Sequence, residues 1–321
     1  MSNESSIKEN GMQKNAAEFN YPSHYAEVFD SKIHYIEAGT GDPILLLHGM
    51  PSSCYVWRNI IPFLSPLGHC LAPDLIGMGK SGKPDIAYTI EDHIHYIEQF
   101  IKVKKLENLI IIMHGWGSLI GFDYAMRHQD NCKGLVFYEA FLRPLQGDDL
   151  SLPYQEQLLE LQHLANKNDL RENAAFFIDK LLPQSMMNKL PAEEMKHYRE
   201  ILGKNEEIEK GIGKVLMQYR EELPRGDGKS KVDQLIATYS KKLTQSTLPK
   251  LLLYSVPGFI TTISTIMWAK EKLPHLEVGD VGEAFHFAQE VSPELMGELI
   301  SAWLQASEQE TRGKERMGGH L

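Results

Sequence analysis

The segment with the clearest chemical meaning runs from Ile110 to Ser118. It reads as an apolar strand that enters a sharp turn and continues as a helix. Several hydrolytic enzymes use this layout to expose a nucleophilic side chain at the tip of the bend. By register the tip residue is Gly115, and Gly117 is small enough to let the helix approach the strand closely. The chain therefore has no side chain that could attack a substrate from the tip.

Other polar residues near this segment are predicted to be structural. Ser118 belongs to the first helical turn, so we expect it to face away from the tip and to hydrogen-bond at the helix start. His48 and Gly49 form the turn that ends a strand, and Asp74 is expected to order the next loop by accepting backbone hydrogen bonds. Metal-ligand spacing and phosphate-cradling glycine loops are both absent from the sequence, so we expect no metal and no cofactor.

The elements that must position the tip alternate between short apolar runs and amphipathic stretches. Strand-like runs occupy residues 32–36, 43–47, 69–73, 109–113, 134–138, 250–254 and 276–279. Helical spacing occurs at residues 90–103, 118–127 and 293–306. Alternation of strands and helices implies right-handed parallel crossovers. We therefore predict an α/β protein with a doubly wound, mostly parallel sheet.

Between residues 145 and 243 the strand pattern disappears and helical patterns take its place. These patterns occupy residues 150–163, 172–182, 191–202 and 231–243. Such an inserted block predicts a cap over the pocket at the carboxyl ends of the strands. The expected organisation is a core of residues 25–144 and 244–306, a helical cap of residues 145–243, and polar tails at 1–24 and 307–321.

An apolar pocket under the cap would suit a small apolar organic molecule. Phe176, Phe177, Met186 and Met187 could line it, although packing in the core is the simpler role for such side chains. The sequence does not fix the oligomeric state.

Composition narrows the class of protein and the kinds of partner. The net charge of −10 argues against nucleic acid or an anionic membrane as the main partner, because both attract clustered positive charge. Three scattered cysteines favour free thiols in a reducing compartment. The polar N-terminal segment lacks the apolar stretch of a signal peptide, and no apolar run is long enough for a membrane span. We therefore expect a cytoplasmic protein.

Several long motifs resemble the haloalkane dehalogenases, enzymes with the α/β-hydrolase fold. They occupy residues 47–62, 72–85, 138–144, 194–199 and 286–290. The resemblance covers roughly residues 25–305 and is greatest to the branch whose catalytic acid is a glutamate after the sixth strand. In that family an aspartate displaces halide to form an alkyl-enzyme ester. A histidine oriented by the acid then activates water to hydrolyse the ester.

The resemblance assigns His286 as the base, Glu139 as the acid and Trp116 as a halide donor. It also places Gly115 where the family has the nucleophilic aspartate, and Met50 where that branch has the second halide donor, an asparagine. Two of the five functional positions have therefore lost their side-chain chemistry. The backbone N–H groups of Met50 and Trp116 would survive as an oxyanion-binding pair, and Trp116 could equally be plain pocket lining.

Three functions follow from this resemblance. The first is a haloalkane dehalogenase-like protein without normal dehalogenase activity, which persists as a binding or non-catalytic member. The second is a residual hydrolase of activated esters or epoxides that uses a water activated by His286 and Glu139. The third is an active haloalkane dehalogenase, as similarity alone would assign. Gly115 itself could reflect relaxed selection, a repurposed site with water in the vacated carboxylate space, or an engineered or miscalled residue.

Overall fold

The structure, a computed structural model, describes residues 19–145, 151–162, 169–201, 203, 205–224, 226 and 228–318. Eight strands form one sheet in the order β1-β2-β4-β3-β5-β6-β7-β8. β2 pairs antiparallel with both of its neighbours, and every pair from β4 through β8 is parallel. The strands are β1 (His24–Val28), β2 (Ser31–Ala38), β3 (Pro43–Leu47), β4 (His69–Pro73), β5 (Leu109–Gly115), β6 (Cys132–Ala140), β7 (Lys250–Pro257) and β8 (Leu276–Ala284).

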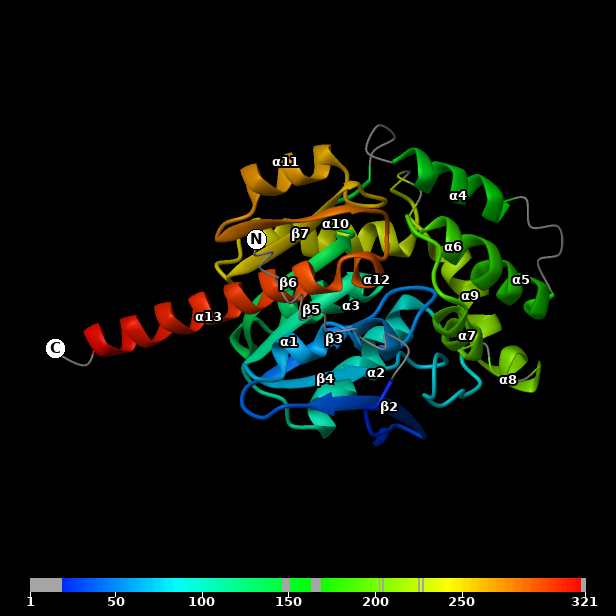
Figure 1. Cartoon of the computed structure of the whole chain (residues 1–321), viewed down its shortest axis with the longest axis horizontal. Helices are drawn as coiled ribbons and strands as arrows, with labels where there is room; N and C mark the ends of the chain where they lie inside the picture. Colours follow the sequence, from blue (N-terminus) through cyan, green and yellow to red (C-terminus); the bar gives the residue numbers. More distant parts are fainter. Residues whose placement is uncertain are drawn as a thin grey trace, which may run out of the picture.

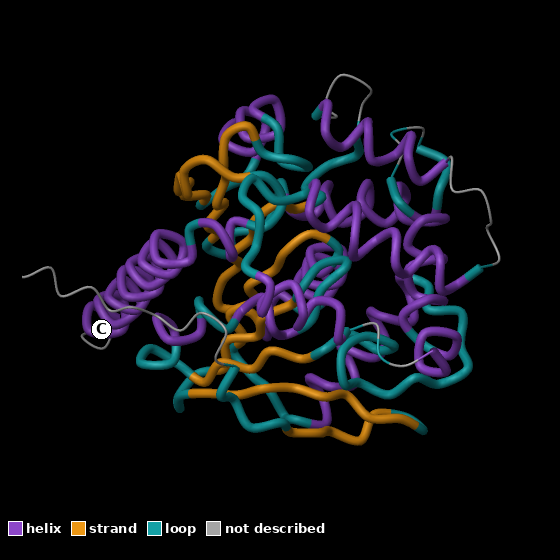
Figure 2. The backbone as a smooth tube through the Cα atoms, turned by 45° about the vertical axis from the view of Figure 1, so that its right-hand side comes forward, coloured by secondary structure: helices purple, strands orange, loops and turns teal. Residues whose placement is uncertain are grey.

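Helices cover both faces of this sheet, as the sequence predicts for a doubly wound fold (Figure 2). One group, α2, α3 and α10, packs together through α3, which also lies against β3, β5 and β6. Another group joins α1, α12 and α13, and α13 lies against β7 and β8. The bounds are α1 (Ile61–Leu64), α2 (Ile90–Val103), α3 (Gly117–Arg127), α10 (Lys231–Leu243), α11 (Ile263–Lys272), α12 (Ala288–Val291) and α13 (Pro293–Gly318), with short turns η1 (Cys54–Trp57) and η2 (Gln129–Asn131).

The remaining helices lie together beside the carboxyl ends of the central strands, on the right in Figure 1. The described part of the chain contains no strand between Ala140 and Lys250, which agrees with the predicted helical block. These helices are α4 (Leu152–Gln162), α5 (Leu170–Phe176), α6 (Leu182–Gln184), α7 (Ala192–Glu200), α8 (Asn205–Lys210) and α9 (Ile212–Glu222), and a π-helical turn, η4 (Phe177–Leu181), joins α5 to α6. We refer to this group, α4 to α9, as the cap.

Local sequence explains where the regular elements begin. Thr89 caps α2, and Asp92 returns a hydrogen bond to its backbone, so the two residues form a capping box. Ser230 and Asp233 make the same box at the start of α10. β3 is a run of apolar residues whose interior positions are fully buried, as expected of a strand covered on both faces. The predicted bounds of α2, β3, β4 and α10 agree with the structure residue for residue.

Several elements differ from the sequence prediction. β1, α8, α9 and α11 were not expected from their patterns. α13 continues to Gly318 and extends away from the body of the protein, past residue 306 where a polar tail was expected (Figure 1). The predicted N-terminal tail falls mostly outside the described residues. None of the described helices is long and apolar enough to cross a membrane.

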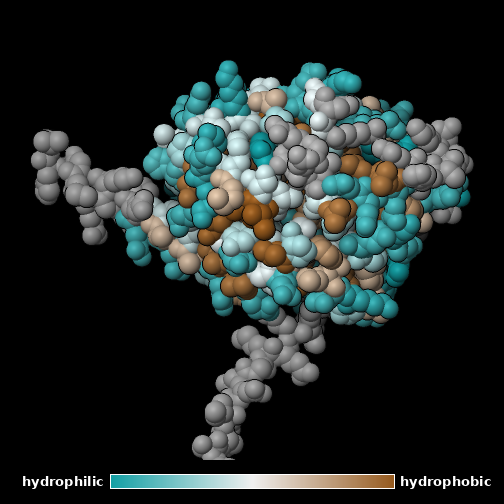
Figure 3. All heavy atoms as spheres, turned by 90° about the horizontal axis from the view of Figure 1, so that it is seen from above, coloured by the Kyte–Doolittle hydropathy of each residue, from teal (hydrophilic) through white to brown (hydrophobic). Residues whose placement is uncertain are grey.

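Hydrophobic side chains are not confined to the interior. Ile263 and Met267 on α11 are each more than half exposed. Figure 3 looks onto the molecule from the side of α11 and shows hydrophobic side chains gathered among hydrophilic ones.

Candidate active site

The predicted tip of the bend lies where the sequence places it. β5 ends at Gly115, which has a φ of +51°, and α3 begins two residues later at Gly117. A Cβ atom on Gly117 would lie 2.6 Å from the carbonyl oxygen of Leu47, so only glycine allows α3 to approach β3 this closely. This confirms the role that the sequence assigns to Gly117.

His286 and Glu139 meet as the resemblance implies. His286 Nδ1 lies 3.3 Å from Glu139 Oε2, and the glutamate is fully buried. With Nδ1–H directed at the carboxylate, Nε2 keeps a free lone pair and can accept a proton. The pair therefore retains the geometry of a general base and the acid that orients it.

Glu139 is held in place by the backbone around it. Its carboxylate accepts hydrogen bonds from the N–H groups of Phe259 (3.0 Å), Ile260 (2.5 Å) and Thr261 (3.3 Å). The residue itself has a φ of +49°, a strained conformation for a non-glycine residue that costs about 1–3 kcal/mol. Strain of this kind persists only where surrounding contacts enforce it, so these three N–H groups fix the acid.

His286 is positioned by both the cap and the sheet. Its backbone N–H donates to the carbonyl of Ser185 in the cap, at 3.0 Å. Its carbonyl accepts a hydrogen bond from His114 Nε2 at 2.7 Å. Burial, with a smaller contribution from the charge of His286, holds the pKa of His114 well below its usual range, so His114 is a neutral donor.

The imidazole of His286 lies against the tip of the bend. An ideal Cβ atom built on Gly115 would be 2.9 Å from His286 Nε2 and 3.1 Å from Cε1. Contacts this short require the ring to shift. The edge of the imidazole therefore borders the space beside Gly115, with Nε2 2.9 Å from the position where a side chain would begin.

Met50 and Trp116, which the resemblance places at the two halide positions, are buried beside the same turn. Met50 is 4% exposed and Trp116 is 2% exposed. Trp116 Nε1 has no hydrogen-bond partner within the described residues, which is compatible with a donor kept free for a ligand, and its ring packs on Tyr219 of α9. The Nε1 of Trp57 also lacks a partner there, so an unpaired indole N–H alone does not identify a site. The structure thus brings Met50, Gly115, Trp116, Glu139 and His286 into one region.

Ser118 has the structural role predicted for it. Its hydroxyl donates to the carbonyl of Gly115 at 2.6 Å and accepts from the N–H of Phe141 at 3.1 Å. The side chain is fully buried between these two partners. Ser118 therefore ties the turn to the end of β6 and is unsuited to replace the missing nucleophile.

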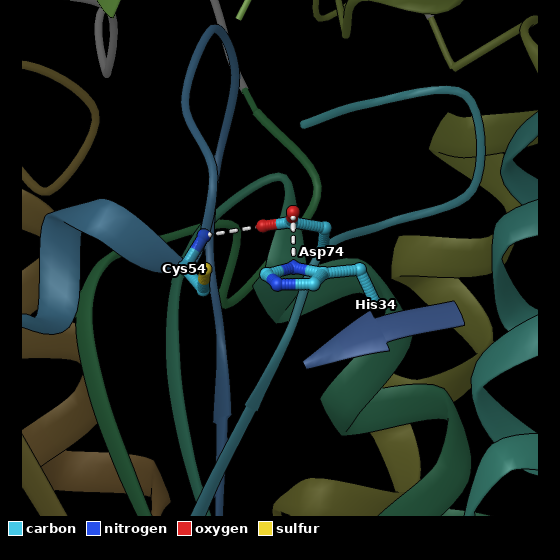
Figure 4. A group of neighbouring side chains, drawn as sticks. All are labelled: His34, Cys54 and Asp74. Atoms are coloured by element: carbon cyan, nitrogen blue, oxygen red, sulfur yellow. Dashed lines mark hydrogen bonds and ion pairs between the residues drawn. The ribbon is translucent and has the colours of Figure 1, made fainter. Parts of the chain in front are cut away.

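Asp74 also orders its loop as expected. Oδ1 accepts from the N–H of Cys54 and Oδ2 accepts from His34 Nδ1, each at 2.8 Å (Figure 4). Oδ2 also accepts from the N–H of Lys80 at 2.8 Å. His34, Cys54 and Asp74 could in principle ligate a metal ion. However, the carboxylate already receives three hydrogen bonds, and burial raises the pKa of the Cys54 thiol, which opposes the thiolate a metal needs. We interpret the group as a structural network.

The Asp74 network should make folding sensitive to acid. Burial opposes ionisation, but the hydrogen bond and charge of His34 outweigh it and lower the pKa of Asp74 from 3.8 to about 2. A pKa lowered on folding adds stability that is present above pH 3.8 and is lost as the pH falls towards 2.

We therefore expect Asp74→Asn to lower the free energy of unfolding by about 2 kcal/mol at neutral pH. The difference in unfolding free energy between the variant and the unmodified protein should shrink as the pH falls from 3.8 towards 2. Urea denaturation measures this difference. Asp130→Asn, at an exposed position on η2, is the matched control. A deficit that is constant down to pH 2 would contradict this role of the charge.

A cavity of about 200 Å³ lies beside the His286 segment, and Ser185 and Phe285 contribute to its wall. None of Phe176, Phe177, Met186 and Met187, the predicted apolar lining, is among the residues that line it. Phe177 and Met186 are buried in the core, which agrees with packing as their role.

Comparisons with known proteins decide the family. A family model described as "alpha/beta hydrolase fold" matches residues 42–293. A haloalkane dehalogenase of Agrobacterium fabrum is 30% identical over 276 residues, which cover 86% of this chain and 89% of the relative. The chain belongs to the α/β hydrolases and is haloalkane dehalogenase-like. A second dehalogenase, from Mesorhizobium japonicum, is 32% identical over 86% of this chain and 89% of its own length.

Solved structures agree with this assignment. The haloalkane dehalogenase DatA of Agrobacterium tumefaciens superimposes on this α/β hydrolase with a TM-score of 0.79 at 29% identity, covering 92% of this chain and 99% of that one. A coelenterazine h 2-monooxygenase of Renilla reniformis is also 32% identical over 87% of this chain and 89% of its own length. The same fold therefore supports more than one chemistry, so the activity must be argued from the site.

Sequence reasoning missed three contributors to the site of this α/β hydrolase. Ser185 holds the backbone of His286, Tyr219 packs on Trp116, and the N–H groups at 259–261 clamp Glu139. None of these contacts uses a chemical motif. The N–H clamp and the Ser185 carbonyl act through the backbone, whose partners are set only by the assembled fold.

Proposed function

We propose that this haloalkane dehalogenase-like hydrolase does not perform the alkyl-enzyme chemistry of its family. The single observation that carries the proposal is Gly115, which leaves no atom to form the ester. Loss of a triad nucleophile costs about 10⁶ in turnover in a well-studied hydrolase. In an otherwise intact site, loss of one polar donor, as at Met50, costs ~10²–10³ in rate, and this loss does not simply add to that of the nucleophile. Similarity alone would assign dehalogenase activity, and these two residues oppose it.

In our proposal the protein has a binding role: it binds a small apolar organic molecule under the cap without converting it. The buried side chains of Met50 and Trp116 would present an apolar surface to such a ligand. We place the protein in the cytoplasm, a location supported by its three free, buried cysteines, Cys54, Cys70 and Cys132. We take the cap, α4 to α9, as the roof of the site; α10, which the sequence assigned to the same helical block of residues 145–243, packs on α3 instead.

A thermal-shift experiment tests the binding role. Haloalkanes and hydrocarbons of matching size should raise the melting temperature by about 3–6 °C at saturation, because a ligand that binds only the folded state stabilises it. Gas chromatography of the same samples should recover the ligand unchanged. A flat response across a broad panel of apolar ligands would count against the role.

A second candidate is hydrolysis of activated esters or epoxides by water. The contact between His286 Nδ1 and Glu139 Oε2, with the acid fixed by three N–H groups, favours it. In ester hydrolysis the water gives a proton to His286 Nε2 while its oxygen bonds to the carbonyl carbon. The alkoxide then leaves and takes up the proton, and the N–H groups of Met50 and Trp116 would stabilise the oxyanion. Such a reaction lacks covalent assistance and should be slow.

A further inference from the structure

The cavity beside the His286 segment is lined by both polar acceptors and aromatic residues. It lies between the cap helix α4, the end of η4 with α6, and the segments that carry Phe259 and Phe285. Its volume of about 200 Å³ equals that of roughly seven water molecules, at about 30 Å³ each. The cavity can therefore hold a small organic molecule.

One side of the cavity consists of hydrogen-bond acceptors from a single face of α4. Glu156, Gln157 and Glu160 follow one another at helical spacing and all three contribute to the wall. Gln157 is 9% exposed, and its Oε1 has no hydrogen-bond partner among the described residues. Glu160 Oε1 pairs with Lys180 at 3.0 Å, whereas its Oε2 is buried and unpaired within the same part of the chain.

Unpaired buried acceptors require donors, because an unsatisfied polar atom away from water costs free energy. None of the described residues that line the cavity is cationic, and Lys180 offsets only one of the two carboxylates on its wall. Phe259 and Phe285 form another part of the wall. Aromatic faces attract a cation and also pack against its carbon chain.

We infer that this cavity binds a small organic ammonium ion, such as a protonated primary alkylamine. Its N–H groups donate to Gln157 Oε1 and Glu160 Oε2, and its alkyl part lies against Phe259 and Phe285. The cavity adjoins the candidate active site, because Phe285 precedes His286 and the Ser185 carbonyl accepts the His286 N–H. Binding is independent of turnover, so it can be tested whether or not the protein is catalytic.

Calorimetric titration of the full chain with n-butylammonium chloride tests the inference, with 1-butanol as the neutral analogue and tetramethylammonium as a cation without N–H groups. Butylammonium should bind saturably to one site, and each comparison ligand should bind about tenfold more weakly or worse. Gln157→Leu and Glu160→Gln should each weaken butylammonium binding by about tenfold, since each removes a hydrogen bond to the cation.

Glu206→Gln is the matched control, because Glu206 also pairs with a lysine, Lys210, on a cap helix but lies outside the cavity wall. It should leave the affinity unchanged. Absence of saturable binding, equal binding of 1-butanol, or equal weakening by Glu160→Gln and Glu206→Gln would overturn the inference. If Gln157→Leu fails to fold, Glu160→Gln and its control still decide the outcome.

Discussion

A double variant, Gly115→Asp with Met50→Asn, should release halide from a bromoalkane. The aspartate restores an atom that can displace bromide, and the asparagine restores the second halide donor beside Trp116. His286 and Glu139 are already placed to hydrolyse the resulting ester. We expect only part of the ~10⁶ loss to be recovered, because the new Cβ would lie 2.9 Å from His286 Nε2 and the ring must first move aside. Ion chromatography of bromide measures the result.

The matched control is Gly115→Asn with Met50→Asn, which adds the same bulk at the tip but a far weaker nucleophile. Adding His286→Ala to the aspartate variant should trap the alkyl ester, visible as a mass increase of one alkyl group on Asp at position 115. A double variant that folds, as judged by circular dichroism, yet releases no bromide would show that the site has lost more than these two side chains.

His286→Ala should abolish whatever ester hydrolysis the unmodified protein shows. A positioned general base contributes about 10²–10⁴ in rate. Hydrolysis by a water that His286 activates has no protein nucleophile that could compensate for the loss of this base. Hydrolysis of p-nitrophenyl acetate at high protein concentration, followed by absorbance, measures the effect. His128→Ala serves as the control, because His128 lies at the surface beside Glu98, at the opposite end of α3 from Gly115. An unchanged rate in His286→Ala would remove the water-based hydrolase from consideration.

Glu139→Gln tests whether the charge of Glu139 orients His286, because glutamine keeps the size of the side chain and removes its charge. The amide keeps one acceptor oxygen for the N–H groups at 259–261 but loses the charge that faces His286 Nδ1. The expected result is a fall in kcat for ester hydrolysis with little change in KM, together with a shifted pH profile. A variant with an unchanged pH profile would show that Glu139 has only a structural role.

The sequence predicted the bounds of helices and strands well where their local sequence patterns are strong. β3 and β4 are apolar runs, and α2 and α10 begin at capping boxes, so their bounds could be predicted residue by residue. α9 was not predicted although it has a buried apolar face, which includes Val215, Leu216 and Tyr219. β1 was not predicted because its five residues depend on pairing with β2. Propensity gives way to packing at such segments.

At the candidate site, too, some features could be predicted from the sequence and others depend on tertiary packing. The resemblance to the haloalkane dehalogenases implied that Gly115, Glu139 and His286 would meet, and the structure brings them together. The sequence did not predict how closely the imidazole of His286 lies against Gly115, because this distance depends on the packing of the folded chain. Nor did it predict the cavity beside α4, because the pattern of residues 150–163 indicates only a helix and no partners for its side chains.

The central claim is that the chain forms no covalent bond to a haloalkane. Concentrated protein incubated with 1-bromobutane, followed by bromide analysis and intact-protein mass spectrometry, tests it most directly. We predict bromide no higher than in a protein-free blank and an unchanged protein mass. Stoichiometric bromide together with the mass of one added butyl group on any side chain of the site would contradict the account.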